Sequence, residues 1–448
     1  MAGKDKVAAE CLDVLVVGSG AREHALVRAL ARSPRIGRLI GAPGNPGIED
    51  DAETVAVKAD DIPALVAFAE RERIDLVVVG PEAPLVAGLA DQLRDRGIAV
   101  FGPGAAEARL EGSKAFAKEI MRSAGVPTAR ADVFTDYQAA LAFLREHGAP
   151  VVIKADGLAA GKGVVVAETE AEAEAALADC FVARRFGEAG ARVLMEERLE
   201  GEELSLLAVV SGEQILPLAP AQDYKRAFDG DKGPNTGGMG SYSPVPAVDD
   251  ALYERIVEEI LRPTVGALSE RGLDYRGVLY AGLMLTGSGP KVLEFNCRFG
   301  DPETQALLPR LESDLLELLW AAANGDNLPQ SVDWRPGAAV GVVMATRGYP
   351  ASSSKGEVIT GLEEVLRLDE VEVFQAGTAR VGRRLVTAGG RVLTVTGMGK
   401  SFAEARARAY AGVAAIQFEG AHYRTDIALR AEEWEKRRGR SAEQEAPR

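Results

Sequence analysis

The first hundred residues alternate between short apolar runs and amphipathic stretches, and this alternation constrains the fold more than any other feature. Four apolar runs are each followed by glycine: Leu12–Val17, Leu39-Ile40, Ile74–Val79 and Ile98–Phe101. Such β–α alternation predicts an open parallel sheet with helices on both faces. Because ligands bind beyond the carboxyl ends of such strands, we expect a binding site at the glycine turns.

After residue 112 the pattern mixes helices with probable hairpins, so the predicted fold class is α/β with several parts. The segment from Asp223 to Ser243 shows little periodicity and is expected to be a long loop, a feature that is usually functional inside a compact domain. We expect an N-terminal α/β domain over residues 1–112 and a central domain over 113–330, made of two α+β subdomains with a flap subdomain over about 126–200. A C-terminal strand-rich α+β domain is expected over 331–432, followed by a charged tail over 433–448.

Composition and charge exclude several classes of protein. The net charge of −15 argues against binding to nucleic acid or to anionic membranes. Three scattered cysteines and three histidines argue against a disulfide scaffold, a zinc ribbon or a His-rich metal site, and favour a reducing, cytoplasmic compartment. Glycine is in excess, 49 of 448 residues or about 11% against an average of about 7%, as expected where backbone approaches ligands.

The first motif is GSGAREH, starting at Gly18. A glycine turn at the start of a helix can present backbone N–H groups, here with Gly20, to a phosphate, and Arg22 is the nearest cation. Glu23 occupies the third glycine position of the dinucleotide-binding fingerprint, which disfavours a Rossmann dehydrogenase. A plain strand-to-helix turn remains the alternative, and His24 is expected to be a structural partner.

The second motif is KADGLAAGKG, starting at Lys154. Three residues separate Gly157 from Gly161, and Lys162 is followed by Gly163, so the motif is not a P-loop. Two β-branched runs flank it, which predicts a glycine flap that closes over a triphosphate. Lys154 lies on the strand itself and needs an anionic partner, which a nucleotide phosphate would supply. A glycine-rich hairpin with a snorkelling lysine is the alternative.

Two further motifs carry acidic side chains. In LEFNCRFGDPE, Glu294 and Asn296 are two apart on a strand and share a face, so their hard oxygens suit Mg²⁺ or Mn²⁺, while Arg298 continues that face toward a carboxylate or phosphate. A solvated sheet face is the alternative. In MEERLEGEE, from Met195 to Glu203, a strand end could bind adenine, although spacing alone favours an acidic surface turn.

In order along the chain, these segments resemble the ATP-grasp superfamily and, within it, the phosphoribosylamine–glycine ligase family of purine biosynthesis. The resemblance runs from about Leu12 to Asp426. It rests on GSGAREHAL, APGNPG, GPEAPLVAG, LEGSKAF, VVIKADGLAAGKGV, QDYKR, GPNTGGMGSYSP, LYAGLM and EFNCRFGDPETQ. It implies an ATP-dependent ligase with Mg²⁺ or Mn²⁺ as cofactor and ATP, glycine and 5-phosphoribosylamine as small-molecule substrates, acting as a monomer or alternatively a dimer.

The resemblance also implies roles for particular residues. It implies ATP binding by two lysines, the glycine flap, a hinge and a ribose-binding carboxylate: Lys114, Lys154, Gly157, Gly161, Lys162, Gly163, Glu196, Leu199 and Glu203. It implies metal ligation by Glu294 and Asn296, and catalytic positions at Lys154, Arg298 and Asp223, the last two holding glycine. It implies further substrate contacts at Gly18, Gly20, Arg22, Glu23, Gly80, Pro81, Glu82, Lys225, Asn235, Thr236 and Gly237.

Three departures from the family pattern accompany the resemblance. Ala21 stands where a second glycine is common, and Tyr224 stands where histidine is common. The strand YAGLML carries no acidic metal ligand, so Glu294 and Asn296 are the ligands that the chain itself offers. The alternatives are another ATP-grasp carboxylate–amine ligase, a biotin-dependent carboxylase, a dinucleotide-binding oxidoreductase and a catalytically silent binding protein.

Overall fold

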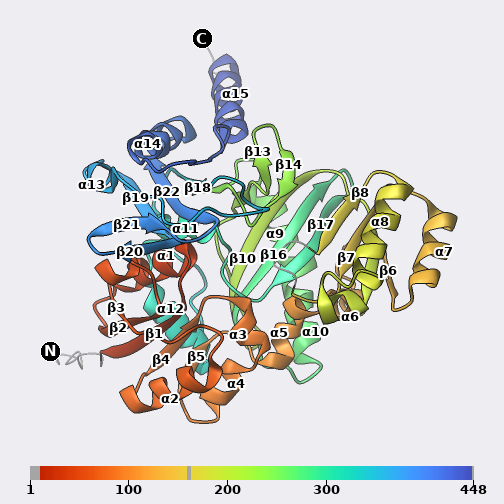
Figure 1. The fold of residues 1–448 in the computed structure, drawn as a ribbon, viewed down its shortest axis with the longest axis horizontal. Coiled ribbons are helices and arrows are strands. Elements are labelled where there is room, and N and C mark those ends of the chain that lie inside the picture. Colours follow the sequence, from red (N-terminus) through yellow and green to blue (C-terminus); the bar gives the residue numbers. More distant parts are fainter. Residues whose placement is uncertain (1–10, 159–162, 446–448) are drawn as a thin grey trace.

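The structure is a computed structural model that describes residues 11–158 and 163–445. Its N-terminal part is a five-stranded parallel sheet in the order β3-β2-β1-β4-β5, drawn at the lower left of Figure 1. Alternate residues of the central strand β1 (Leu12–Gly18) belong to two different hydrophobic cores, Val14 and Val16 to one and Leu15 and Val17 to the other. Both faces are therefore covered, as the sequence predicted.

In the rest of this part strands and helices alternate, except that β3 follows β2 without an α-helix and two helices separate β4 from β5; two further helices then lead to the central domain. The elements are α1 (Ala21–Leu30), β2 (Ile36–Pro43), β3 (Glu53–Thr54), α2 (Ile62–Glu72), β4 (Leu76–Val79), α3 (Glu82–Val86), α4 (Leu89–Arg94), β5 (Ala99–Phe101), α5 (Ala105–Gly112) and α6 (Lys114–Ala124). Ser113 accepts a hydrogen bond from Phe116 N at the start of α6, and Gly125 ends it in the left-handed conformation.

The central domain holds two antiparallel sheets, ordered β6-β9-β7-β8 and β11-β10-β16-β17. The first sheet has its own core and projects to the right in Figure 1. Its elements are β6 (Ala131–Phe134), α7 (Tyr137–His147), β7 (Val151–Ala155), β8 (Val164–Ala167), α8 (Glu170–Phe181) and β9 (Val193–Glu197). The second comprises β10 (Glu202–Ser211), β11 (Gln214–Pro217), β16 (Arg276–Thr286) and β17 (Gly289–Asn296), with helices α9 (Asp250–Ile256), α10 (Arg262–Ser269), α11 (Thr304–Leu307) and α12 (Leu315–Asn324).

The loop predicted from Asp223 to Ser243 is instead a series of short strands, and that prediction was wrong. The strands are β12 (Gln222–Asp223), β13 (Arg226–Phe228), β14 (Lys232–Asn235) and β15 (Gly240–Ser243). Two of them join the C-terminal sheet, ordered β12-β15-β18-β22-β19, in which β15 pairs with β18 (Ala338–Ala345). Strands of two to four residues are too short for a periodic signal, and the partner of β15 in the C-terminal sheet lies about a hundred residues away in sequence.

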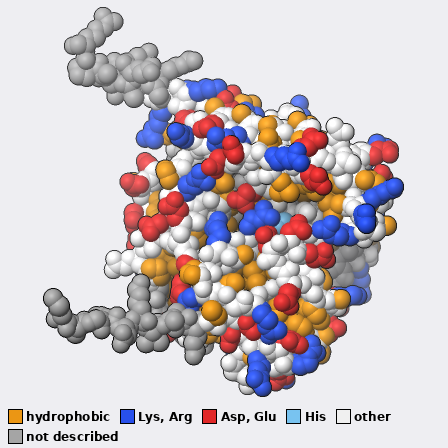
Figure 2. All heavy atoms as spheres, turned by 90° about the vertical axis from the view of Figure 1, so that its left-hand side faces the viewer, with side chains coloured by type: hydrophobic (Ala, Val, Ile, Leu, Met, Phe, Trp, Pro, Cys, Tyr) orange, Lys and Arg blue, Asp and Glu red, His pale blue; other side chains and the backbone are white. Residues whose placement is uncertain are grey.

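The C-terminal domain completes this sheet, and the predicted domain boundaries remain predictions. Its remaining elements are α13 (Leu362–Val365), β19 (Val371–Gln375), β20 (Thr378–Val381), β21 (Arg384–Thr387), β22 (Arg391–Gly399), α14 (Phe402–Ala415) and α15 (Leu429–Glu445). The stretch from residue 433, predicted to be a charged tail, is helical as far as Glu445. Among the described residues, no helix combines the length and apolar character needed to cross a membrane. Figure 2 shows acidic and basic side chains interspersed over one face.

Candidate active site

Two lysines flank one buried carboxylate where the sheet β6-β9-β7-β8, called the flap sheet below, meets α6. Lys154 on β7 and Glu196 on β9 come from paired antiparallel strands, and Lys154 Nζ lies 2.9 Å from Glu196 Oε2. Lys118 Nζ lies 3.4 Å from the other oxygen of the same carboxylate. Lys154 also donates to Leu293 O at 2.9 Å, which ties the flap sheet to β17. The anionic partner expected for Lys154 was a phosphate, whereas in the structure it is Glu196.

A third lysine, Lys114, begins α6 and donates from Nζ to Gly157 O at 3.0 Å, at the entrance of the glycine segment. At the other side of that segment, the carbonyl of Gly163 accepts a hydrogen bond from Ala155 N at 2.8 Å. Gly161 and Lys162 lie outside the described residues. Burial lowers the pKa of Lys114, and it lowers that of Lys118 to about 8. We call Lys114, Lys118, Lys154 and Glu196 the lysine cluster. The sequence analysis missed Lys118, whose helical spacing resembles that of a surface residue.

Glu294 and Asn296 lie on β17 beside the lysine cluster. Burial raises the pKa of Glu294, but four cations outweigh burial and hold it below its ordinary value: Lys225, Lys154, Lys114 and Arg298. Among the described residues, no hydrogen bond or ion pair occupies this carboxylate. An ionised, unoccupied carboxylate next to an amide oxygen suits a hard divalent cation. Within residues 11–158 and 163–445 no group of three His, Cys, Asp or Glu could hold a metal ion, so these two fit a cation that phosphate oxygens also ligate.

The guanidinium group of Arg298 is held by side-chain oxygens of three other residues. Its Nη2 lies 3.3 Å from Glu111 Oε1 and donates to Asn296 Oδ1 at 3.3 Å, while its Nε donates to Glu82 Oε2 at 3.3 Å. Burial lowers the pKa of Arg298, but Glu111 and Glu82 outweigh that effect and raise it. The sequence analysis missed Glu111, although it lies within the LEGSKAF motif. Its carboxylate also accepts from Cys297 N at 2.7 Å, so Glu111 holds both the strand end and the guanidinium.

A second acidic group surrounds Lys225. Its Nζ lies 2.6 Å from Glu203 Oε2 and 3.7 Å from Asp223 Oδ1. The Asp223 side chain is only 7% exposed, and burial, reinforced by Glu303 and Glu203, raises its pKa to about 7 although Lys225 acts the other way. We call the four carboxylates around the two cations the carboxylate cluster: Glu82, Glu111, Glu203 and Asp223, with Arg298 and Lys225.

The glycines of the first motif pack around Glu23. Its Oε2 accepts from Gly20 N at 2.6 Å, and Arg22 Nε donates to its Oε1 at 2.6 Å. A Cβ atom at Gly80 would lie 2.1 Å from Glu23 Oε1, and one at Gly18 would lie 2.6 Å from Glu23 Cγ. The carboxylate therefore fills the space between two strand ends, which explains why both turns need glycine and why the third glycine of a dinucleotide motif is absent.

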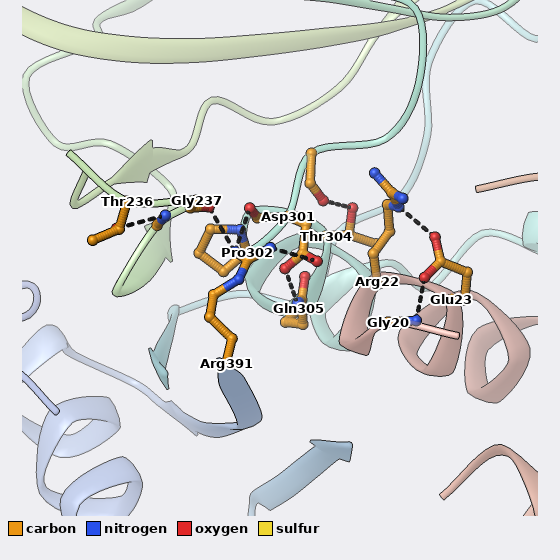
Figure 3. Close-up of polar contacts among 12 residues, drawn as sticks. Gly20, Arg22, Glu23, Thr236, Gly237, Asp301, Pro302, Thr304, Gln305 and Arg391 are labelled. Atoms are coloured by element: carbon orange, nitrogen blue, oxygen red, sulfur yellow. Dashed lines mark hydrogen bonds and ion pairs between the residues drawn. The ribbon is translucent and has the colours of Figure 1, made fainter. Parts of the chain in front are cut away.

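A cluster that the sequence analysis missed lies next to this turn. Figure 3 shows Arg391 reaching from β22 toward Asp301 and Gly237. Arg391 Nη1 donates to Gly237 O at 2.6 Å, and Nη2 lies 3.1 Å from Asp301 Oδ2. Burial raises the pKa of Asp301, but Arg391 and then Arg22 outweigh it and hold the pKa low. A Cβ atom at Gly20 would lie 3.6 Å from Asp301 Oδ2, so three domains meet here.

Other predicted positions lie at the edges of these clusters. Pro81 precedes α3, whose first residue is Glu82. Thr236 donates from Oγ1 to Lys225 O at 2.8 Å, which links it to the carboxylate cluster. Leu199 is half-buried in the connection between β9 and β10, and Asn235 is exposed on β14. The structure does not bring Asn235 into either cluster. His24 is buried and accepts from Gln375 N at 2.8 Å, as expected of a structural partner.

Comparison with known proteins decides the family. Three family models match consecutive parts of the chain: the N domain of phosphoribosylglycinamide synthetase over residues 12–111, its ATP-grasp (A) domain over 112–304 and its C domain over 339–430. The chain belongs to the phosphoribosylglycinamide synthetase family. It is an ATP-grasp ligase of purine biosynthesis, so the fold class and family expected from the motifs are confirmed.

Curated relatives of this family cover almost the whole chain. A phosphoribosylamine–glycine ligase of Allochromatium vinosum is 54% identical over 423 residues, 94% of this chain and 99% of that protein. One of Escherichia coli O157:H7 is 51% identical over 431 residues, 95% of this chain and all of that protein. These relatives match from the N-terminal sheet to the C-terminal domain.

Solved structures support the same family assignment. The crystal structure of phosphoribosylamine–glycine ligase from Thermotoga maritima superposes with a TM-score of 0.82 at 35% identity, covering 93% of this chain and all of that one. Biotin carboxylase from Campylobacter jejuni reaches a TM-score of 0.72 at 17% identity, covering 94% of this chain and 95% of that one. The second likeness shows a shared fold only.

Proposed function

We propose that the chain joins glycine to 5-phosphoribosylamine at the expense of ATP, giving glycinamide ribonucleotide, ADP and phosphate. Family membership supports this activity. The observation that carries the assignment of the site is the position of Glu294, an ionised carboxylate under the influence of Lys114 and Lys154 on one side and of Lys225 and Arg298 on the other. A ligase of this kind needs nucleotide phosphates and an amino acid to meet at one point.

The proposed reaction has two steps. A carboxylate oxygen of glycine attacks the γ-phosphorus of ATP, the bond from that phosphorus to the β–γ bridging oxygen breaks, and ADP leaves glycyl phosphate behind. The amino nitrogen of phosphoribosylamine then attacks the glycyl carbonyl carbon, the bond to the phosphate oxygen breaks, and the amine loses a proton. No nucleophilic side chain is required, because phosphorylation itself activates the carboxylate.

In this proposal the lysine cluster serves the nucleotide. Lys114 and Lys154 neutralise charge on the phosphoryl oxygens in the transition state, as preorganised cations do elsewhere. With three lysines against one glutamate, the cluster has two positive charges in excess when its groups are ionised. The segment from Gly157 to Gly163 covers the phosphates, the connection containing Glu196 and Leu199 meets adenine through its backbone, and Glu203 accepts from the ribose.

The carboxylate cluster serves glycine. Arg298 holds the glycine carboxylate in line with the γ-phosphate, and Asp223 faces the glycine ammonium group. Glu82 and Glu111 fix the Arg298 guanidinium from two sides, at 3.3 Å each, so its planar fork is oriented before substrate binds. Glu294 and Asn296 would hold Mg²⁺ or Mn²⁺, and that ion when bound would neutralise charge on the phosphates.

Phosphoribosylamine is proposed to bind where the N-terminal glycine turns meet the short strands of the central domain. The proposed contacts are Gly18, Gly20, Arg22, Glu23, Gly80, Pro81, Glu82, Lys225, Asn235, Thr236 and Gly237. Arg391 and Asp301 lie at the centre of this region and join the list. Excluding water here matters because the acyl phosphate hydrolyses readily.

The deciding experiment is an ADP-release assay in which ATP, Mg²⁺, glycine and phosphoribosylamine are each omitted in turn. We expect full turnover only with all four, and Mn²⁺ to replace Mg²⁺. ATP hydrolysis that is indifferent to glycine would contradict the proposal, and turnover with another amine would point to a different ATP-grasp ligase. Light scattering during gel filtration tests the accompanying proposal that the chain is a monomer, and cell fractionation tests a cytoplasmic location.

A further inference from the structure

A cavity of about 140 Å³ lies between the C-terminal sheet and the end of the central domain, away from the clusters described above. Four cations and two carboxylates line it: Arg310, Arg335, Lys400, Arg408, Glu370 and Glu404. The cavity therefore has a formal charge of +2 within a chain of net charge −15. Local positive charge in an acidic protein is the opposite of what the average composition favours.

Arg310 is the buried cation among these, and its guanidinium carbon lies 5.6 Å from the centroid of the Trp334 ring. It is 7% exposed, and no carboxylate pairs with it among the described residues. Its Nη1 donates to Ser243 Oγ at 2.9 Å, its Nη2 donates to Arg335 O at 3.4 Å, and its Nε has no hydrogen-bond partner. Burial lowers its pKa to about 10. A buried guanidinium normally has an acid beside it, because desolvation of an unpaired charge is costly.

The other cations of the cavity do not cancel its excess positive charge. Arg335 lies 2.5 Å from Glu370, and Arg408 lies 2.8 Å from Glu404, so each of these pairs is neutral. Lys400 follows β22 directly, and its ammonium group forms no hydrogen bond or ion pair with the described residues. Arg310, which is buried, and Lys400, which is exposed to solvent, thus account for the two cations without a paired carboxylate.

We propose that this cavity is a binding site for a phosphate-sized oxyanion, held by Arg310 and Lys400 with Arg408 alongside. A volume of about 140 Å³ is sufficient for a tetrahedral oxyanion. The site is distinct from the proposed phosphoribosylamine site, because Arg391 begins β22 and Gly399, which lines the cavity, ends it, a span of about 27 Å at about 3.4 Å per residue.

The test is a titration of the full chain with inorganic phosphate, followed by calorimetry and by thermal unfolding. Because phosphate is also a product of the proposed reaction, the background is a Lys114→Met/Lys154→Met chain, which lacks the two lysines proposed to hold the ATP phosphates. We expect this chain to bind one phosphate and to unfold at a higher temperature when phosphate is present. Adding Lys400→Gln/Arg408→Gln is expected to weaken phosphate binding at least tenfold, since charge-assisted hydrogen bonds are the strong ones.

The matched control is Lys58→Gln/Arg73→Gln, which removes two exposed cations from the N-terminal domain and lowers the net charge equally. The control is expected to bind phosphate as before, and Lys400→Arg/Arg408→Lys is expected to retain binding. Equal affinity in the cavity variant and the control would overturn the proposal, as would a crystal grown in phosphate without density between Arg310 and Lys400. Arg310→Met serves as a second variant where it folds, with ribose 5-phosphate testing whether larger phosphomonoesters are excluded.

Discussion

The lysine cluster and the carboxylate cluster lie side by side and have opposite balances of charge. The first holds three lysines and one glutamate, which pairs with Lys118 and Lys154; in the second, four carboxylates share one arginine and one lysine. Glu294 lies between them and is influenced by cations from both. Neither cluster is neutral by itself, which is unusual for buried charge.

The difference matches the ligands that the two clusters are proposed to receive. An excess of positive charge favours the binding of nucleotide phosphates, and an excess of carboxylate favours the binding of an amino group and a metal ion. Each imbalance is a cost to the unliganded protein that binding relieves. Removing one charge should therefore have a different effect on each side, and the predictions below use that difference.

The largest effect is expected on the lysine side. Lys154→Met is expected to lower kcat by about 10²- to 10³-fold, because it removes a preorganised cation from the transition state. The assay is coupled ADP release, with circular dichroism to check the fold. Lys154→Met/Glu196→Gln separates two roles: if Lys154 only neutralises Glu196, the double variant should recover turnover, and we expect that it does not.

Glu294→Gln tests the junction between the two clusters. Loss of the carboxylate is expected to raise the Mg²⁺ concentration needed for half-maximal activity by about 10- to 100-fold, the range typical of damaged metal sites. Activity is measured against metal concentration, and Mn²⁺ binding is measured by electron paramagnetic resonance. Glu200→Gln, at an exposed glutamate on the β9–β10 connection, is the control. An unchanged metal dependence would remove Glu294 from the list of ligands.

Arg391→Gln extends the comparison to the cluster drawn in Figure 3. The variant loses its contacts to Asp301 and Gly237, and the KM for phosphoribosylamine is expected to rise about tenfold, equivalent to about 1.4 kcal/mol, with little change in the KM for ATP. Arg380→Gln, on the half-exposed surface of β20, is the control. Equal rises in both KM values would indicate a general loss of structure instead.

The smallest effect concerns stability and pH. Burial raises the pKa of Asp223 to about 7 in the folded chain, against about 3.9 when unfolded. The folded state then binds more protons between about pH 4 and pH 7, so stability falls as the pH rises through that window. Asp223→Asn should have a higher free energy of unfolding than the parent at pH 8 and the same free energy of unfolding at pH 4. Urea unfolding at the two pH values measures this, and a difference that persists at pH 4 would refute the assignment.

Local sequence patterns predicted the strands of the N-terminal sheet because apolar runs ending at glycine alternate there with amphipathic stretches. The run Leu12–Val17 lies within β1, and the parallel sheet followed from that strand–turn–helix alternation. The strands between Gln222 and Ser243 escaped prediction because each has only two to four residues, and because β15 pairs with β18, about a hundred residues further along the chain. Helix α15 escaped because it was interpreted from charge alone.

The sequence by itself determined the family, the fold class and the candidate lysines and carboxylates, because motif order and spacing carry that information locally. Only the tertiary structure decided which charges meet. It paired Lys154 with Glu196, Arg298 with Glu111 and Arg391 with Asp301, and it folded the Glu23 carboxylate into the space that Gly18 and Gly80 leave open. Such partners are up to about two hundred residues apart in sequence, and burial, which sets the strength of each interaction, exists only once the domains have packed.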